Sequence, residues 1–410
     1  MRMNIVSKLK IIDIRIWAKE RYHQVINSIA FYPAIIALLF LIVSALSISF
    51  DFSEEGKQLK SHLQWLKLKD ASTARSIISS IAAGIISLTV FSFSMVMIVL
   101  NQTAAQMSNR ILDKLIGSRF QQVVLGIYVG TIVYALFLLS TIRDIDDGIH
   151  IPALSTYLLI ALTICDIFLF IYFLHYITQS VKYDVIIKRI HKDTKDALEQ
   201  THDLNVQSIT SPFEERQTIT NTKSGIYEGV SENALIEICD AHDATVFILP
   251  TPGSFLLEGI PMIKSNKLLP DDIVNEIQMT LYVHSTESID DNFFYGFKQL
   301  SEVAIKALSP GINDPGTAIQ ALRALFELLR YKVNHFQAVV IRNKSGQVRI
   351  IKEELTFKKI FETTILPIWD YGKNDRLIQN ELATLLSQMQ SLTPHESVAQ
   401  LMLDMDLYKK

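Results

Sequence analysis

The sequence has few cysteines and no excess of charge of either sign. Its 410 residues include two cysteines, Cys165 in an apolar run and Cys239 in the more polar second half. Two isolated thiols supply neither a disulfide framework nor a set of four metal ligands, which agrees with a reduced cytosolic domain. The formal net charge is −3, and no basic field dominates either half. We therefore expect no binding to nucleic acid.

The common catalytic motifs are also missing. The sequence contains no HExxH, no GxSxG, no phosphate-binding P-loop and no dinucleotide fingerprint. Asp240, His242 and Asp243 form a short acidic and histidine cluster, but no second cluster lies near it in the sequence, so a solvated helix end explains it better than a metal site. We predict that the protein is not an enzyme and has no catalytic residues, no metal and no cofactor.

Long apolar runs are concentrated before residue 182. Four of them are long enough to cross about 30 Å of hydrocarbon. The first run lacks a small-residue cleavage site, so we interpret it as an anchor and not as a signal peptide. The four predicted spans are residues 29–50, an uncharged run between Arg75 and Arg110, residues 121–142 and residues 151–181.

The remaining sequence has a soluble composition. Short apolar runs between glycine and proline turns predict strands, and amphipathic runs predict helices. Residues 336–353 predict a hairpin around an Asn-Lys-Ser-Gly turn, and Thr393, Pro394 and Glu396 predict a capping box for the last helix. The predicted fold class is membrane α-helical, with four transmembrane helices, plus a cytosolic α+β domain. The predicted parts are a cytosolic amphipathic N-terminal arm (1–28), a four-helix transmembrane domain (29–181), a helical extension and polar linker (182–223) and the cytosolic α+β domain (224–410).

Basic residues flanking the spans predict the orientation in the membrane. Fourteen lie on the side of the N-terminal arm and six on the opposite side. Both termini should therefore be cytoplasmic. The fourteen are Arg2, Lys8, Lys10, Arg15, Lys19, Arg21, Arg110, Lys114, Arg119, Lys182, Lys188, Arg189, Lys192 and Lys195, and the six are Lys57, Lys60, Lys67, Lys69, Arg75 and Arg143.

The second span carries polar residues at intervals of seven. Such a seam stays aligned when a helix joins a left-handed bundle. One interpretation is close helix packing, because small residues let backbones approach and hydroxyls bond across the contact. The other is a pore lined by one such helix from each subunit. The seam consists of Thr73, Ser80, Ser87, Ser94 and Asn101, and Ser108 continues it.

Asp166 is the one acid inside the fourth predicted span. Ionisable groups at membrane depth are rare and suggest an ion path or a protein-facing partner. The spans contain no lysine or arginine to pair with it, so Asp166 should be protonated, bonded to a hydroxyl or in contact with water. A second interpretation starts the span at Ile151 and puts Asp166 about one turn from the cytosolic boundary, where the energetic cost is small.

Residues 308–322, LSPGINDPGTAIQAL, form the most structured short motif. Pro310 and Gly311 stop one helix, Asp314 can cap the next and Pro315 suits its first position. One interpretation is a rigid corner between two helices. The alternative is a ligand or subunit contact, since free amides at a helix N-terminus bind anions and Lys306 is within reach. The candidate residues of this cytosolic motif are Lys306, Ser309, Asn313, Asp314 and Thr317.

Seven stretches of the sequence together resemble a bacterial family of predicted membrane proteins, domain of unknown function 2254. The resemblance spans nearly the whole chain and implies four spans followed by a cytosolic domain, and it implies no activity. The stretches are FYPA (31–34), TARSIISSIA (73–82), VFSFSMVMIVLNQTAAQMSNRIL (90–112), LGIYVGTIVYAL (125–136), SGIYEGV (224–230), PGSFLLEGIPMI (252–263) and KALSPGINDPGTA (306–318).

These observations favour a protein of the bacterial inner membrane that is channel-like or transports a solute, as a homo-oligomer with a cytosolic regulatory domain. The alternative is a membrane-anchored sensory or scaffolding protein whose helices only anchor and oligomerise. The expected partners are the lipid bilayer, further copies of the chain and an ion or small solute.

Overall fold

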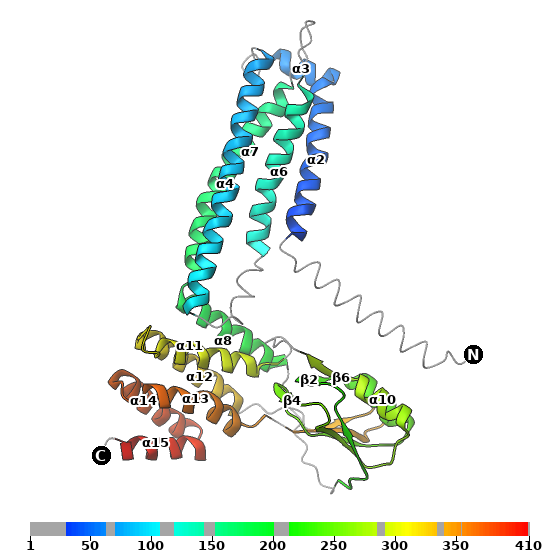
Figure 1. Ribbon diagram of the computed structural model, residues 1–410, viewed down its shortest axis with the longest axis vertical. Coiled ribbons are helices and arrows are strands. Elements are labelled where there is room, and N and C mark those ends of the chain that lie inside the picture. The colour runs from blue at the N-terminus through cyan, green and yellow to red at the C-terminus, as the bar shows by residue number, and fades with distance from the viewer. Residues whose placement is uncertain are drawn as a thin grey trace, which may run out of the picture. The chain divides into compact units, whose positions relative to one another are not determined.

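A computed structural model describes most of the chain, in two compact units that divide after Val181 (Figure 1). The predicted N-terminal arm and Ser108 lie outside the described residues. The described residues are 30–62, 70–106, 119–142, 152–200, 213–284, 292–333, 340–353 and 355–408.

The first unit, called the membrane unit here, is helical. Four of its helices are long and apolar enough to cross a membrane, which confirms the predicted number of spans. The predicted boundaries agree to within a few residues, because an uninterrupted apolar run is the strongest signal in such a sequence. The helices are α2 (Phe31–Phe52), the short α3 (Glu54–His62), α4 (Ala71–Gln106), α6 (Arg119–Thr141) and α7 (Ala153–Ser180).

Helices α2 and α6 pack closely because α6 presents two glycines to α2. A Cβ atom at Gly126 would lie 2.6 Å from Ile36 Cδ1 and 3.1 Å from the Cα of Pro33. A Cβ at Gly130 would lie 2.7 Å from Cγ of Phe40. Small residues one turn apart let membrane helices approach in this way. The FYPA and LGIYVG stretches, far apart in the sequence, therefore meet in the structure.

The second unit, called the α+β unit, begins with α8 (Tyr183–Gln200), which packs on α11 and α12. A Cβ at Gly296 of α11 would lie 1.6 Å from Oγ1 of Thr194 of α8, so only glycine fits there. The remaining helices are α9 (Glu232–Ala241), α10 (Asp271–Met279), α11 (Phe294–Ala307), α12 (Pro315–Val333), α13 (Phe357–Gly372), α14 (Arg376–Leu392) and α15 (Glu396–Tyr408).

Two sheets complete the α+β unit. A five-stranded sheet has the order β1-β5-β3-β8-β7, with β3 and β8 parallel and the other pairs antiparallel. A three-stranded antiparallel sheet has the order β4-β2-β6. The strands are β1 (Gln217–Thr220), β2 (Gly225–Val230), β3 (Val246–Ile248), β4 (Ser254–Leu256), β5 (Pro261–Ser265), β6 (Leu281–His284), β7 (Val340–Arg342) and β8 (Val348–Lys352).

The predicted hairpin is confirmed, since β7 and β8 pair antiparallel. Asn343 Oδ1 accepts from the amides of Ser345 and Gln347, which forms the turn. The predicted polar linker is wrong at residues 217–220, because this short segment pairs with β5 and buries Ile219. One buried residue in a four-residue strand leaves too little periodicity to detect.

The predicted capping box of the last helix is also wrong. The hydroxyl of Thr393 bonds back to the carbonyl of Met389 and so belongs to the end of α14. Nδ1 of His395 accepts instead from the amide of Ser397 in the first turn of α15. The helix therefore starts two residues later than a capping box would require.

Candidate functional site: a buried polar cluster between three membrane helices

Asp166 lies at the middle of α7, where its residue is 1% exposed. The neighbouring hydroxyl on α6 belongs to Thr131, which is also about midway along its helix. Twelve residues separate Thr131 from Arg119 at the start of α6, which corresponds to roughly 18 Å along the axis. Asp166 and Thr131 therefore both lie near the middle of their helices, which favours a position inside the membrane over one at its boundary.

Two further polar side chains lie beside this pair. Tyr128, one turn before Thr131 on α6, lies near both Asp166 and Ser92 of α4. The residues Ser92, Tyr128 and Thr131 are each 0% exposed. Three different helices thus direct polar groups to one place in the apolar interior of the membrane unit. We refer to Ser92, Tyr128, Thr131 and Asp166 as the buried cluster.

The oxygen atoms of the buried cluster are not hydrogen-bonded within the described part of the chain. These atoms are both carboxylate oxygens of Asp166 and the hydroxyl oxygens of the other three residues. A buried polar atom without a partner costs on the order of 1–3 kcal/mol, and a charged one costs more. An ionised carboxylate in this arrangement is therefore energetically costly.

The four spanning helices supply no nearby positive charge. In their sequences, lysine and arginine occur as Arg75 and Arg119, each near a helix end. Arg75 is 17 residues before Ser92, which is roughly 26 Å along α4. The guanidinium of Arg75 lies against the carbonyl of Ile142 at 3.4 Å. An ionised Asp166 thus has no protein counter-charge close to it.

A second polar group in the same unit, around Asp51, does form hydrogen bonds. Asp51, at the end of α2, accepts at 2.7 Å from the backbone amide of Ser155 in the first turn of α7. Tyr134 of α6 bonds to the hydroxyl of Ser47 at 2.8 Å and to the carbonyl of Ser155 at 3.2 Å. A carboxylate at a helix N-terminus is favoured by the free amides and the helix dipole. Hydrogen bonds of this group therefore link α2, α6 and α7.

The seam residues of α4 all lie on the exposed face of the single chain. Thr73, Ser80, Ser87, Ser94 and Asn101 are exposed, and Ser108 is outside the described residues. The opposite face of α4 is the buried one. It contains Ala74, Ile78, Ala82, Ile85, Ser92 and Val96.

Three of the seam hydroxyls make local hydrogen bonds. Ser87 and Ser94 donate to the carbonyls four residues earlier, at 2.9 and 2.8 Å. Thr73 donates at 2.9 Å to Asp70, which caps α4 by accepting from the Thr73 amide at 2.6 Å. The seam therefore does not pack within one chain, and these hydroxyls do not need water.

The motif at residues 306–318 forms the corner between α11 and α12. The amide and hydroxyl of Ser309 both donate to the carbonyl of Lys306, at 3.1 and 2.7 Å. Asn313 has a φ of 50°, a conformation that asparagine adopts more readily than most residues. Asp314 accepts from the amide and the hydroxyl of Thr317, at 3.1 and 2.6 Å. As predicted from the sequence, Asp314 caps α12, and this geometry is that of a rigid corner.

Tyr183, in the first turn of α8, lies near Asp314. Burial raises the pKa of the Tyr183 phenol, and the negative charge of Asp314 raises it further. Tyr183 follows the last residue of α7 by three positions. The corner thus lies beside the segment of the α+β unit that directly continues the fourth span in the sequence.

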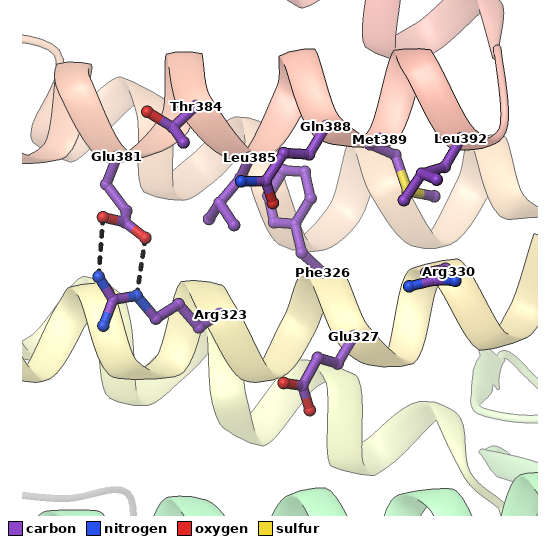
Figure 2. A pocket seen from close by; sticks show the side chains of 10 residues that line it. All are labelled: Arg323, Phe326, Glu327, Arg330, Glu381, Thr384, Leu385, Gln388, Met389 and Leu392. Atoms are coloured by element: carbon purple, nitrogen blue, oxygen red, sulfur yellow. Dashed lines mark hydrogen bonds and ion pairs between the residues drawn. The ribbon is translucent and has the colours of Figure 1, made fainter.

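A groove lies between α12 and α14 in the α+β unit (Figure 2). Its volume is about 490 Å³. Arg323 and Glu381 close one end with two parallel bonds of 2.7 and 3.1 Å, drawn as dashed lines in Figure 2. Both apolar side chains, such as Phe326 and Leu385, and polar ones, such as Arg330, line the remainder.

Sequence reasoning found Asp166 but missed Ser92, Tyr128 and Thr131. Tyr128 and Thr131 are three residues apart, so they share one face of a helix, and this spacing was the available signal. Ser92 lies two residues before Ser94, and a helix turns about 200° over two residues. It therefore points away from the seam. In the sequence, only its position on the opposite face of the helix distinguishes Ser92 from the seam serines.

The comparisons with known proteins agree with the membrane architecture. Residues 26–388 match the family described as "Predicted membrane protein (DUF2254)". The chain is similar to an uncharacterized protein of Mycobacterium bovis and to one of Mycobacterium tuberculosis, each with 24% identity over 328 residues. The alignment covers 77% of this chain and 63% of each mycobacterial chain, so the chain spans less than two thirds of those relatives. No solved structure matches.

Proposed function

The chain belongs to this family of predicted membrane proteins, and on that premise we propose that it is an oligomeric channel-like or transport protein of the bacterial inner membrane. In this proposal α4 from several copies lines or borders a polar path, and the α+β unit regulates it from the cytoplasm. The transported species is an ion or a small solute.

The position of the seam on α4 carries the proposal. The seam runs from Thr73 to Asn101 on the exposed face, which corresponds to about 42 Å of helix. That length exceeds the hydrocarbon core of about 30 Å. A polar row of this length gains no hydrogen bonds or close packing from lipid. If it faces further copies of α4, it can support either helix packing or a water-filled path.

The hydrogen bonds within the seam favour a second candidate. Ser87 and Ser94 already donate to backbone carbonyls of their own helix, so these hydroxyls are satisfied in a dry contact. A membrane-anchored sensory or scaffolding protein, whose helices only anchor and oligomerise, would use the same seam for packing alone.

Cysteine accessibility separates the two candidates. Single cysteines replace Ser80, Ser87 and Ser94 in the full-length protein lacking Cys165 and Cys239, and a charged, membrane-impermeant thiol reagent is applied from both sides. Ile86 and Phe93 provide matched controls, because each is exposed in the single chain at 45% and 50% and directly precedes a seam residue. Labelling of the seam with silence at the controls supports a wet path.

Silence at all seam positions, in protein that remains oligomeric, would leave an anchor and contradict the channel proposal. Labelling at seam and control positions alike would indicate that the face is open to water without forming a path. In both cases the buried face, sampled at Ala82 and Ile85, should remain unlabelled because these residues are 5% and 2% exposed.

A further inference from the structure

We propose that the buried cluster is a binding site for one monovalent metal cation, of the sodium class, inside each subunit. The ligands are the carboxylate of Asp166 and the hydroxyl oxygens of Ser92, Tyr128 and Thr131. The site lies within one chain, so it goes beyond the proposed path along α4 and does not depend on it.

The ligand set is made only of oxygen. Carboxylate and hydroxyl oxygens suit hard cations, whereas thiolates and imidazoles would indicate softer metals. All five oxygen atoms are buried, and they belong to neighbouring side chains of three helices. The described residues contain no group of three or more acidic, histidine or cysteine side chains of the kind that holds a divalent metal.

Charge balance selects a single positive charge. One carboxylate is present, and the helix sequences have no lysine or arginine near it. A divalent ion would leave a net positive charge at membrane depth, where an uncompensated charge is costly. A monovalent cation neutralises Asp166, and the three hydroxyls add neutral oxygen ligands.

The comparison with the Asp51 group distinguishes a cation site from polar contacts that only hold helices together. Both groups combine a buried aspartate and a buried tyrosine with hydroxyl residues in the same unit, although Ser47 of the Asp51 group is half-buried and the Ser155 hydroxyl has no partner among the described residues. Around Asp51, hydrogen bonds of 2.7 to 3.2 Å are formed. In the buried cluster, no hydrogen bond of comparable geometry reaches the carboxylate or the three hydroxyls from the described residues. Oxygens arranged around a shared cation point at the cation and not at one another.

The site would also link the two faces of α4. Ser92 points into the bundle, while Ser87 and Ser94 on the same helix face outward. A cation held by α4, α6 and α7 together would fix the rotation of α4, and with it the direction of the seam.

The test measures the thermal stability of the purified full-length protein in detergent at constant ionic strength. The protein is compared in four chloride salts, those of sodium, potassium, lithium and N-methylglucamine. N-methylglucamine is a bulky organic cation and provides the reference. We expect a saturable rise in Tm with at least one of the small cations, since a ligand that binds only the folded state stabilises it. Asp166→Asn should abolish the dependence, and Thr131→Val and Tyr128→Phe should weaken the apparent affinity about tenfold each.

Asp51→Asn is the matched control. The substituted amide would keep an oxygen acceptor for the cap, and position 51 lies at the far end of α2, beside Ser155, about 16 Å along α7 from Asp166. This variant should retain the full cation dependence. Lowering the pH should shift the midpoint of the sodium-dependent rise in Tm to higher sodium concentrations, because protons compete with sodium for Asp166. Among the titratable groups of the described helices, Tyr128 lies near Asp166, Cys165 and His175 are on the same helix, and Asp51, Arg75 and Arg119 are near helix ends.

The same Tm in all four salts would overturn the proposal. So would a dependence that survives Asp166→Asn, or one that Thr131→Val and Tyr128→Phe both leave unchanged. A stability that follows pH alone, equally in sodium and N-methylglucamine, would overturn it in favour of a protonated aspartate. If Asp166→Asn does not fold, the two hydroxyl variants and the wild-type salt series decide the question.

Discussion

Asp70 and Asp314 stabilise the first turns of two long helices in the same way. Each precedes its helix and accepts hydrogen bonds from both the backbone amide and the hydroxyl of a threonine three residues later, Thr73 in α4 and Thr317 in α12. The threonine thereby satisfies one free amide and orients the carboxylate that caps the helix dipole. Two threonines that the sequence offers as functional candidates thus have structural roles.

Replacing Asp314 with alanine removes the cap of α12. We expect a loss of about 1 kcal/mol of local stability, because alanine at an N-cap leaves the first amides without a side-chain acceptor. Hydrogen exchange of the peptide containing residues 315–318, measured in the full-length protein, should become about fivefold faster. Asp314→Asn keeps an acceptor oxygen and should exchange nearly as slowly as the wild type. Unchanged exchange together with lost activity would indicate a functional role for the corner.

Arg349 explains the acidic cluster after α9. Its side chain is 7% exposed and bonds to Asp240 at 2.6 Å and to Asp243 at 3.1 Å. A hydrogen bond from Asn343 lowers the pKa of Asp240, and Arg349 lowers it further. The pKa of Asp243 is lowered by Lys267 and then by Arg349. The cluster is therefore an ion-pair network that joins the end of α9 to β8, where the sequence predicted a solvated helix end.

These lowered pKa values predict a dependence of stability on pH. A carboxyl group with a lower pKa in the folded state stabilises the fold above its unfolded pKa of about 3.9, and this contribution is lost as the pH falls through the folded pKa. Arg349→Met should therefore reduce stability at neutral pH and flatten the change in stability below about pH 4. Acid denaturation of the full-length protein measures both effects. Arg376→Met, at an exposed arginine of α14, should alter neither, and an unchanged acid slope in Arg349→Met would contradict the assignment.

At the scale of elements, the contact between α2 and α6 depends on backbone proximity. A methyl group at Gly130 would lie 2.7 and 2.8 Å from two ring carbons of Phe40. We expect Gly130→Ala to lower the free energy of unfolding by about 1–3 kcal/mol through overpacking. The Tm in detergent provides the measurement, and Phe40→Ala in the same chain should restore part of the loss. Gly84→Ala is the control, since a Cβ there meets no atom within 4 Å. A Gly130→Ala protein as stable as the wild type would contradict this packing.

The elements show what the sequence could predict. Apolar runs determined the number of spans because their signal extends over more than 20 residues. The seam on α4 was visible as a period of seven, yet periodicity does not tell which face of a helix is buried. The face became clear only from the packing of Ile78 and Ile85 inside the unit. The partners of Asp166 come from α4 and α6, and single-sequence patterns contain no information on contacts between helices.

Short polar features were the least predictable. Thr393 suited a cap, but its hydroxyl bonds to the preceding helix, because several hydroxyl and amide groups compete for the same backbone atoms at a helix end. The cap at Asp314 was predicted correctly, since Pro315 restricts the residue before it to extended conformations and thereby marks the boundary.

At the scale of the whole molecule, four membrane crossings by α2, α4, α6 and α7 would put the segments before α2 and after α7 on the same side of the membrane. The distribution of basic residues predicts which side is cytoplasmic, because positively charged loops are retained in the cytoplasm. Fourteen lysines and arginines flank the spans on the side of the termini and six flank them on the other. The segment after α7, which begins with Lys182, contributes five of the fourteen.

We therefore predict that both termini are cytoplasmic. Alkaline phosphatase, which is active only in the periplasm, and green fluorescent protein, which matures in the cytoplasm, are fused in turn after Lys60 and after Lys410. The Lys60 fusion should show phosphatase activity, and the Lys410 fusion should fluoresce. Replacing Lys182, Lys188 and Arg189 with glutamine should reduce the fluorescent fraction at Lys410, because fewer charges then retain the C-terminal side. Phosphatase activity at Lys410 in the otherwise unaltered chain would reverse the orientation, place the α+β unit outside the cytoplasm and exclude its proposed role as a cytosolic regulator.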